Sequence, residues 1–184
     1  ALVKRFFDII FSLAVIFGLL IWLTPLLAIL IRLESRGPLY FVQKRSGLDN
    51  KDFNCYKFRS MAMNRHADKQ QASKDDMRIT SIGRFIRKTS IDELPQFYNV
   101  LFGNMSVVGP RPHMLKHTDE YSHKVDKYMV RHLVKPGITG LAQVRGYRGE
   151  IERDSDIQNR IKFDVFYIEN WSFLLDMKII VQTI

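Results

Sequence analysis

The sequence predicts a small, helix-rich α+β domain that an apolar N-terminal segment docks on a membrane. Three observations support this prediction. First, 46% of the 184 residues are apolar, which is enough for one hydrophobic core and excludes an intrinsically disordered chain. Second, the apolar residues crowd the first 31 positions. Third, residues 41–90 hold 12 Lys and Arg against 5 Asp and Glu, or +7 of the net charge of +9, which indicates an anionic partner.

The apolar segment runs for 23 uncharged residues, from Ile9 to Ile31. A straight transmembrane helix needs about 20 such residues and is one interpretation. Thr24-Pro25 argues against it, because proline removes a backbone donor and clashes with the carbonyl four residues back. Basic residues stand on both sides of the segment, and such flanks prefer the cytoplasmic face. We therefore expect residues 1–36 to form a re-entrant membrane helix hairpin, broken at Thr24-Pro25, that enters and leaves by one face.

Residues 37–184 are expected to form one globular unit that begins with a β-hairpin. Two short runs rich in aromatic residues, near 39–43 and 53–58, are typical of strands, and the turn residues 47–50 join them. A polar stretch, 61–76, follows, where we expect a helix and then a loop.

The rest of this unit is predicted to be mostly helical. Helical patterns cover 82–89, 95–102 and 113–132, and a strand-like stretch follows at 139–144. The chain closes with an amphipathic helix, 154–170, and a further apolar stretch. We expect these last elements to be interfacial, with their aromatic side chains at the level of lipid headgroups; ordinary core positions are the alternative.

Several functional classes are excluded by what the sequence lacks. Cys55 is the only cysteine, which rules out a disulfide framework and a Cys-rich zinc module and fits a reducing compartment. No P-loop, GxGxxG, GxSxG or HExxH motif is present, which argues against common NTPases, dinucleotide enzymes, serine hydrolases and zinc proteases. His113 and His117 have the spacing of metal ligands, but without such a motif we expect surface histidines.

The first candidate site is Asp92-Glu93. One interpretation is structural, because Ser90-x-x-Glu93 matches a helix capping box. Pro95 favours another, since proline prefers the first helical position, which leaves both carboxylates just ahead of a helix. Carboxylates kept ionised at that place suit a metal ligand or a nucleophile. The residue types leave both interpretations open.

The second candidate site is a basic cluster that leads towards Asp92. Three of its members lie three and four residues apart and share one helix face. A solvated face is the ordinary interpretation; a bound polyanion, such as a diphosphate bridged by a divalent metal, is the functional one. We expect no nucleic acid, because no nucleic-acid motif is present. The cluster comprises Lys57, Arg59, Arg78, Arg84, Arg87 and Lys88.

The third candidate site is Pro110-Arg111-Pro112. Two prolines flank the arginine, so its guanidinium is held in place at little entropic cost. The fragment is short, and a plain turn is the alternative.

In combination, these motifs resemble the bacterial sugar transferases, also called polyprenyl-phosphate hexose-1-phosphate transferases. The match covers nearly the whole chain, and the late block, with residues 135–140 and 146–150, is similar to the branch that builds exopolysaccharides. The motifs that carry the resemblance are Lys4-Arg5-Phe6-Phe7-Asp8, Tyr56-Lys57-Phe58-Arg59-Ser60-Met61, Asp76-x-Arg78-x-Thr80, Gly83-Arg84-x-x-Arg87, Asp92-Glu93-Leu94-Pro95-Gln96 and Gly109-Pro110-Arg111-Pro112.

The resemblance implies a reaction and a set of roles. A UDP-sugar gives its sugar 1-phosphate to a polyprenyl phosphate, undecaprenyl phosphate, with release of UMP and a requirement for Mg²⁺. Asp92 is then the nucleophile, and Asp92 and Glu93 are the metal partners. Arg87 binds phosphate, and residues 110–112 belong to the nucleotide site. The resemblance also places Thr24-Pro25 at the break of the re-entrant helix.

The resemblance further implies a location. These enzymes sit in the lipid bilayer of the bacterial inner membrane with the active site on its cytoplasmic face. Members of the exopolysaccharide branch usually carry extra membrane spans, so the chain, which begins with Ala, is expected to be the catalytic part of a longer protein. A homodimer is left open.

Three alternatives remain at this stage. Glucose 1-phosphate is favoured by the C-terminal block, with galactose next, and an acetamido sugar would give a sister enzyme. A non-catalytic, membrane-anchored module whose basic face binds anionic lipid or RNA is the competing class. Such a module would tolerate the loss of any one cation, whereas an enzyme would be abolished by the loss of Asp92 alone.

Overall fold

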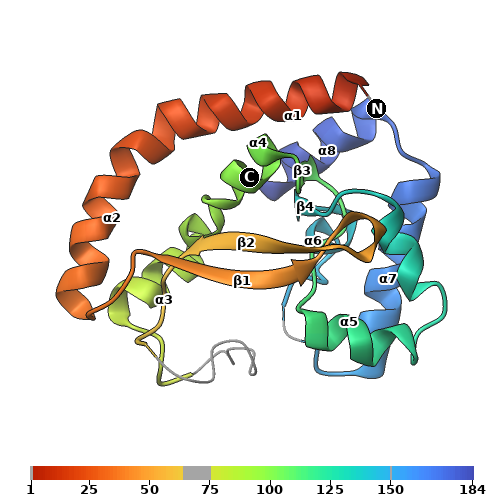
Figure 1. The fold of residues 1–184 in the computed structure, drawn as a ribbon. Helices are drawn as coiled ribbons and strands as arrows, with labels where there is room; N and C mark the ends of the chain where they lie inside the picture. The colour runs from red at the N-terminus through yellow and green to blue at the C-terminus, as the bar shows by residue number, and fades with distance from the viewer. Residues whose placement is uncertain (1, 64–75, 150) are drawn as a thin grey trace.

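The computed structural model describes residues 2–63, 76–149 and 151–184. It is rich in helix and holds a small amount of sheet, as expected for the α+β class (Figure 1). Most of the expected polar helix over 61–76 lies outside the described residues.

The N-terminal segment is one long helix that arches over the rest of the domain (Figure 1). Its parts are α1 (Leu2–Val15), a π-helical turn (Ile16–Leu20) and α2 (Ile21–Glu34), which contains Pro25. By length and composition the helix could cross a membrane. A π turn just before a proline is a known cause of bending, because both loosen the helical hydrogen-bond ladder. The backbone bends but stays helical through Pro25, so two separate hairpin legs are not confirmed.

Charged residues of the first helical turns fix this helix to the domain. The Nζ of Lys4 lies 2.5 Å from Oδ2 of Asp176, and Arg5 donates to the backbone carbonyls of Val100 and Leu101, at 2.5 and 2.8 Å. Asp8 is buried and accepts a hydrogen bond from the backbone N–H of Val107 at 3.0 Å. These residues therefore do more than flank the apolar segment, because they join it to the globular unit.

The predicted hairpin is confirmed. Strands β1 (Tyr40–Ser46) and β2 (Asp52–Phe58) pair antiparallel, and Ser46 lies opposite Asp52 beside the turn. Helix α4 (Gln96–Phe102) packs against β2. The buried side chain of Asn99 accepts from the backbone N–H of Tyr56 at 3.0 Å and donates to the carbonyl of Asn54 at 2.6 Å. The side-chain amide thus pairs with one N–H and one carbonyl of β2 that have no strand partner on this side in the part of the chain that the structure describes.

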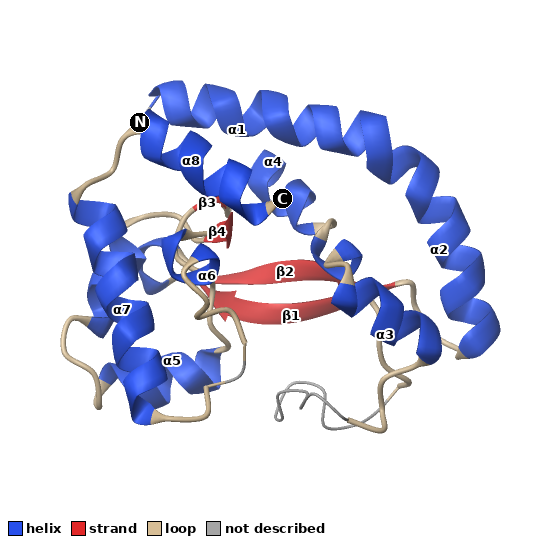
Figure 2. Ribbon diagram, turned by 180° about the vertical axis from the view of Figure 1, so that it is seen from behind, coloured by secondary structure: helices blue, strands red, loops and turns tan. Residues whose placement is uncertain are grey.

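The helices around the hairpin are partly as predicted. Helix α3 (Ser81–Lys88) is confirmed, and its first turn is capped by the hydroxyl of Thr80. Helix α7 (Asp154–Glu169) is confirmed as well, and α8 (Phe173–Thr183) forms the apolar C-terminus and lies beside α1 (Figure 2).

Two predicted elements are wrong in extent. The single helix over 113–132 is instead α5 (Leu115–Ser122), a non-helical stretch over 123–127 in which Lys127 adopts a left-handed φ of 59°, and a 3₁₀ turn (Tyr128–Leu133). The strand over 139–144 is instead β4 (Gly137–Thr139), which pairs parallel with β3 (Ser106–Val108), and a short helix α6 (Leu141–Val144). Extended backbone at Gly140 separates the two elements.

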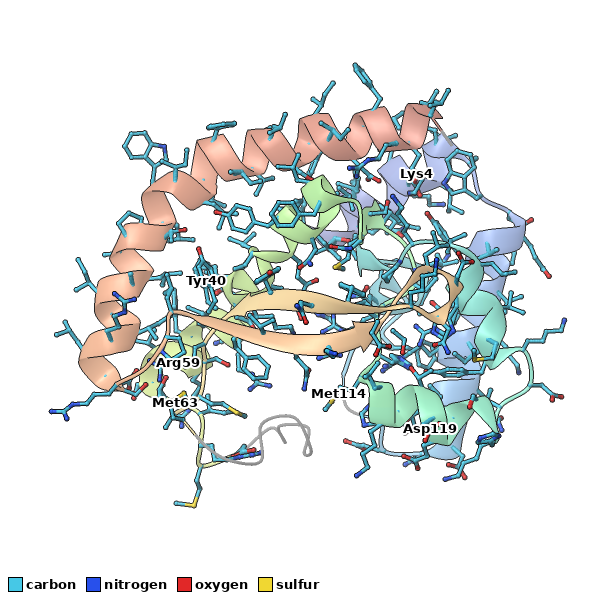
Figure 3. All side chains as sticks on the ribbon, in the orientation of Figure 1. Lys4, Tyr40, Arg59, Met63, Met114 and Asp119 are labelled. Atoms are coloured by element: carbon cyan, nitrogen blue, oxygen red, sulfur yellow. The ribbon has the colours of Figure 1, made fainter. Side chains whose placement is uncertain are left out.

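The long helix shares the main hydrophobic core of the domain. Ile16, Leu20, Leu27 and Ile31 pack there with side chains of the hairpin, α3 and α4. The outward face of the same helix leaves large apolar side chains exposed, and sticks project from it away from the domain (Figure 3). Trp22 is 75% exposed, for example. One face of the helix thus belongs to the core, and the other is unpartnered within the part of the chain that the structure describes.

Candidate active site

The Asp92-Glu93 pair lies in a tight turn between α3 and α4. Ser90 has a left-handed φ of 60°, and a 3₁₀ turn, Ile91–Glu93, follows it. Helix α4 begins after Pro95, as the second interpretation of this motif predicted. The capping box is wrong, because the hydroxyl of Ser90 makes no capping bond.

Glu93 is held by three cations. Its Oε1 accepts from Nζ of Lys57 at 2.9 Å and from Nη2 of Arg111 at 2.6 Å, and its Oε2 lies 3.4 Å from Nη2 of Arg148. The Arg111 and Lys57 charges hold the pKa of the buried Glu93 carboxyl well below its usual range, against the effect of burial. Glu93 is therefore a fixed anion.

Asp92, unlike Glu93, has no cation bound to its carboxylate within the described part of the chain. Asp92 is only 8% exposed, yet among the described residues its carboxylate makes no hydrogen bond or ion pair. Burial raises the pKa of Asp92; the charge of Lys57 opposes this shift, the neighbouring Glu93 adds to it, and Arg87 and Arg111 oppose it more weakly. A partly desolvated carboxylate with free lone pairs is available for chemistry or for a ligand.

Asp92 opens onto a pocket of about 430 Å³ beside the hairpin. Of the predicted substrate-binding residues, Lys57, Arg59, Arg87, Arg111 and Pro112 line this pocket with Asp92. The motifs come from segments far apart in the sequence, and the fold brings them to one cavity.

Four predicted residues lie elsewhere. Arg84 and Lys88 are exposed on α3 and do not line the pocket. Arg78 is ion-paired with Asp76, with Nη2 and Oδ2 2.5 Å apart. Pro110 lines a separate, much smaller hollow. The helix face that Arg84, Arg87 and Lys88 were expected to share thus presents only Arg87 to the pocket.

Arg59 has a second environment besides the pocket. It is buried, and it donates to the carbonyls of Ser35, Arg36 and Pro38 at 2.7 to 3.0 Å. These carbonyls follow the end of α2, where orphan acceptors need partners. Arg59 therefore ties the end of the long helix to the pocket wall.

The loop that carries Arg111 is held on both sides. The backbone N–H of Gly137 donates to the carbonyl of Pro110 at 2.9 Å, and Nη2 of Arg131 donates to the carbonyl of Arg111 at 2.5 Å. Glu93 in turn raises the pKa of Arg111. The guanidinium is thus fixed by its backbone as well as by its ion pair.

The prediction that His113 is a surface histidine is wrong. His113 is buried, and its Nδ1 lies 2.7 Å from the phenolic oxygen of Tyr128. Burial and the charge of Arg131 hold the pKa of His113 well below its usual range, so the ring is neutral. His113 and the half-buried His117 both line the pocket. No local pattern distinguishes them from surface residues, since Tyr128 comes from a later turn.

Sequence reasoning missed three further cations of the pocket: Arg45, Arg148 and Arg160. Nη2 of Arg148 donates to Oγ of Ser90 at 2.6 Å, which joins the C-terminal block to the Asp92-Glu93 turn. The only sequence signal was the block around Arg148, which contributed to the family resemblance but suggested no contact.

The magnesium ion that the family resemblance implies would find one carboxylate, Asp92, among the described residues that line the pocket. Among the described residues there is no group of three or more His, Cys, Asp and Glu side chains placed to bind a metal. Mg²⁺ commonly binds through one or two carboxylates together with water and substrate phosphates. Asp92 is one such carboxylate and has no ion-pair partner among the described residues, whereas the adjacent Glu93 would have to share its oxygens with Lys57 and Arg111.

Comparison with known proteins finds relatives over the whole chain. A family model described as bacterial sugar transferase matches residues 1–184. The chain is 49% identical over 98% of its length to a UDP-glucose:undecaprenyl-phosphate glucose-1-phosphate transferase of Klebsiella pneumoniae, of which it covers 39%. It is 45% identical over its whole length to a UDP-N-acetylgalactosamine-undecaprenyl-phosphate N-acetylgalactosaminephosphotransferase of Aeromonas hydrophila, of which it covers 43%.

A third relative is named for galactose rather than for glucose or N-acetylgalactosamine. The chain is 41% identical over 98% of its length to an undecaprenyl-phosphate galactose phosphotransferase of Salmonella typhimurium, of which it covers 39%. The chain thus spans about two fifths of the length of these curated relatives.

Proposed function

The chain belongs to the bacterial sugar transferase family, and from this premise we propose that it moves a hexose 1-phosphate from a UDP-sugar to undecaprenyl phosphate, with release of UMP. The observation that supports the proposal most strongly is that two adjacent carboxylates have different electrostatic environments. Glu93 is neutralised by cations, whereas Asp92 faces the pocket with no ion-pair partner among the described residues. The printed names of the relatives supply the substrate class.

The donor is bound by the cations of the pocket. Lys57, Arg87 and Arg111 lie around Asp92 and oppose the negative charge of a diphosphate. Because Arg111 is fixed by Glu93 and by its own loop, it holds the donor at little entropic cost. Without these cations, the negative charge of the Asp92 carboxylate would repel the donor phosphate.

The chemistry takes place in two displacements at one phosphorus atom. An oxygen of Asp92 attacks the phosphorus next to the sugar, the bond from that phosphorus to the bridging oxygen breaks, and UMP leaves with the electron pair. A phosphate oxygen of the lipid then attacks the same phosphorus and expels Asp92 as a free carboxylate. The raised pKa of Asp92 supports this role, since burial makes its ionised form less solvated and more reactive.

Magnesium is proposed as the cofactor. Asp92 and Glu93 would hold it together with the donor phosphates, and when bound it lowers the repulsion between anions and stabilises charge on the leaving phosphate.

The long helix supports a place at a membrane. Its outward face is apolar and exposed, while its inner face is packed into the core. We propose that residues 1–36 are re-entrant, with the bend near Pro25 inside the bilayer and the active site on the cytoplasmic face of the bacterial inner membrane. The pocket lies close to this helix, since Tyr40, Arg59 and Met63 extend its lining towards α2 (Figure 3). A lipid phosphate at the headgroup level would thus be near Asp92.

Glucose 1-phosphate is the proposed cargo, with galactose and an acetamido sugar as alternatives. The named relatives differ in the sugar, and their identities to this chain are similar, from 41% to 49%. The experiment is a measurement of UMP release from a panel of UDP-sugars, with and without undecaprenyl phosphate. We expect release with UDP-glucose and none from Asp92→Asn. Anionic-lipid or RNA binding without UMP release would instead support the non-catalytic polybasic module.

A further inference from the structure

Arg148 is a cation of the pocket that the reaction described above does not use. It follows the short helix α6, 58 residues from Ser90 in sequence, and its side chain lines the pocket together with Asp92. Its Nη2 donates to Oγ of Ser90 at 2.6 Å and lies 3.4 Å from Oε2 of Glu93. The guanidinium therefore spans the edge of the Asp92-Glu93 turn.

Arg148 is the most loosely held of the three cations at Glu93. The Lys57 and Arg111 side chains are 19% and 21% exposed and lie 2.9 and 2.6 Å from Oε1. The Arg148 side chain is 46% exposed, and its 3.4 Å contact is longer than the roughly 2.7–2.9 Å of a strong charged hydrogen bond. Removing Arg148 would leave Glu93 with its two shorter ion pairs.

The backbone on both sides of Arg148 is fixed. The N–H of Tyr147 donates to the carbonyl of Ala142 at 3.0 Å, and Nη2 of Arg160 donates to the carbonyl of Gly149 at 3.0 Å. Any displacement of the guanidinium is therefore a rotation of a long, exposed side chain, which is fast and costs little.

A diphosphate is a stronger acceptor for a guanidinium than the partners that Arg148 has in this structure. One of those partners is a neutral hydroxyl, and the other is a carboxylate already paired with two cations. Phosphate oxygens match the planar fork of arginine and accept two parallel hydrogen bonds from it. We propose that Arg148 is a donor-binding residue whose guanidinium leaves Ser90 and Glu93 for the diphosphate of the nucleotide sugar. This inference rests on the proposed function.

The test compares two arginines of one segment. Arg148→Ala removes the proposed contact, and Arg145→Ala is the matched control, because Arg145 is exposed and does not line the pocket. The measurements are kcat and KM for UDP-glucose and the Kd of UDP by calorimetry. For Arg148→Ala we expect KM and the UDP Kd to rise about tenfold, with a smaller change in kcat. Arg145→Ala should stay within about twofold of the wild type.

A purely positioning role for Arg148 predicts a different split. Arg148→Ala would then lower kcat through a misplaced Glu93 and leave the UDP Kd unchanged, and this result would overturn the inference. Arg148→Lys keeps the charge and the fold but loses the planar fork, so it should recover only part of the UDP affinity. Full recovery would contradict a bidentate phosphate contact.

Ser90→Ala tests the release step. The variant removes the shortest contact that holds Arg148 in the unbound state, so the arginine is freed for the donor. We expect UDP to bind about twofold to threefold more tightly, because less of the binding energy is spent on releasing the arginine. An unchanged or weaker UDP affinity would refute release from Ser90. Wild-type protein that neither uses UDP-glucose nor binds UDP would refute the proposed function itself.

Discussion

Nη2 of Arg111 lies 2.6 Å from Oε1 of Glu93, and this ion pair is what separates the roles of the two carboxylates. It fixes Glu93, together with Lys57 at 2.9 Å, while Asp92 keeps its oxygens directed at no partner among the described residues. The pair also aims the guanidinium of Arg111 at the pocket that Asp92 shares.

Loss of the Arg111 side chain should impair donor use. Because a hydrogen bond to a charged group is worth about 1.5–3 kcal/mol, Arg111→Ala is expected to lower kcat/KM for UDP-glucose roughly tenfold to a hundredfold. Arg111→Lys should restore only part of the loss, since a point charge lacks the planar fork. Steady-state kinetics on both variants decide the matter, and wild-type kinetics in Arg111→Ala would remove Arg111 from the site.

The two carboxylates should differ in stability as well as in activity. Glu93→Gln leaves Lys57 and Arg111 without their anion, so it should lower the free energy of unfolding by about 1–3 kcal/mol. Asp92→Asn removes a buried charge that has no ion-pair partner among the described residues, so it should leave stability unchanged or raise it. Denaturant titrations in detergent measure both. Equal losses in the two variants would mean that Asp92 also has a stabilising partner.

Activity should be lost at a higher pH than the fold. Burial raises the pKa of Asp92, so the nucleophile is protonated, and activity falls, at a pH above the ordinary aspartate value of about 3.9. Protonation of Asp92 relieves the cost of burying its charge, so stability does not fall at that step. Glu93 has a lowered pKa, and its contribution to stability is lost only as the pH falls below the ordinary glutamate value of about 4.3.

The check is a pH profile of kcat/KM measured beside circular dichroism. The expected result is a window of acid pH in which the protein is folded and inactive, and in which activity returns on neutralisation. Simultaneous loss of activity and of structure would contradict the assignment of Asp92 as the titrating group.

The topology of the long helix can be tested by cysteine labelling in intact cells. Cys55 is the only cysteine and is buried, so it gives little background. Cysteines introduced near position 2 and near position 36 should be labelled from the same side of the membrane if the helix is re-entrant. Labelling from opposite sides would instead show a straight span. Pro25→Ala should favour the straight form, because it restores a backbone donor to the middle of the helix.

Features that depend on neighbouring residues were predicted from the sequence, and features that depend on distant ones were not. The hairpin follows from its strand residues and turn, and the start of α4 follows from Pro95. By contrast, Arg148 reaches Ser90 across 58 residues, and no local pattern records such a contact.

The erroneous predictions have physical causes that a hydropathy pattern does not contain. The helix expected over 113–132 ends at Ser122, and Lys127 takes a left-handed conformation just before the 3₁₀ turn, so the two segments cannot form one continuous helix. His113 looks polar in sequence, but the hydroxyl of Tyr128 and the surrounding helices enclose it. The motifs in the sequence located the candidate site. Only the structure shows that Glu93 is ion-paired whereas Asp92 has no ion-pair partner among the described residues.

The proposed mechanism depends on Asp92 as the nucleophile. The most direct measurement is mass spectrometry of the protein after incubation with UDP-glucose and Mg²⁺ in the absence of lipid phosphate. We expect a mass increase of one hexose phosphate on the peptide that contains Asp92, with release of UMP, and loss of the adduct when undecaprenyl phosphate is added. If no adduct forms and UMP leaves only when both substrates are bound, transfer is direct and Asp92 is not the nucleophile.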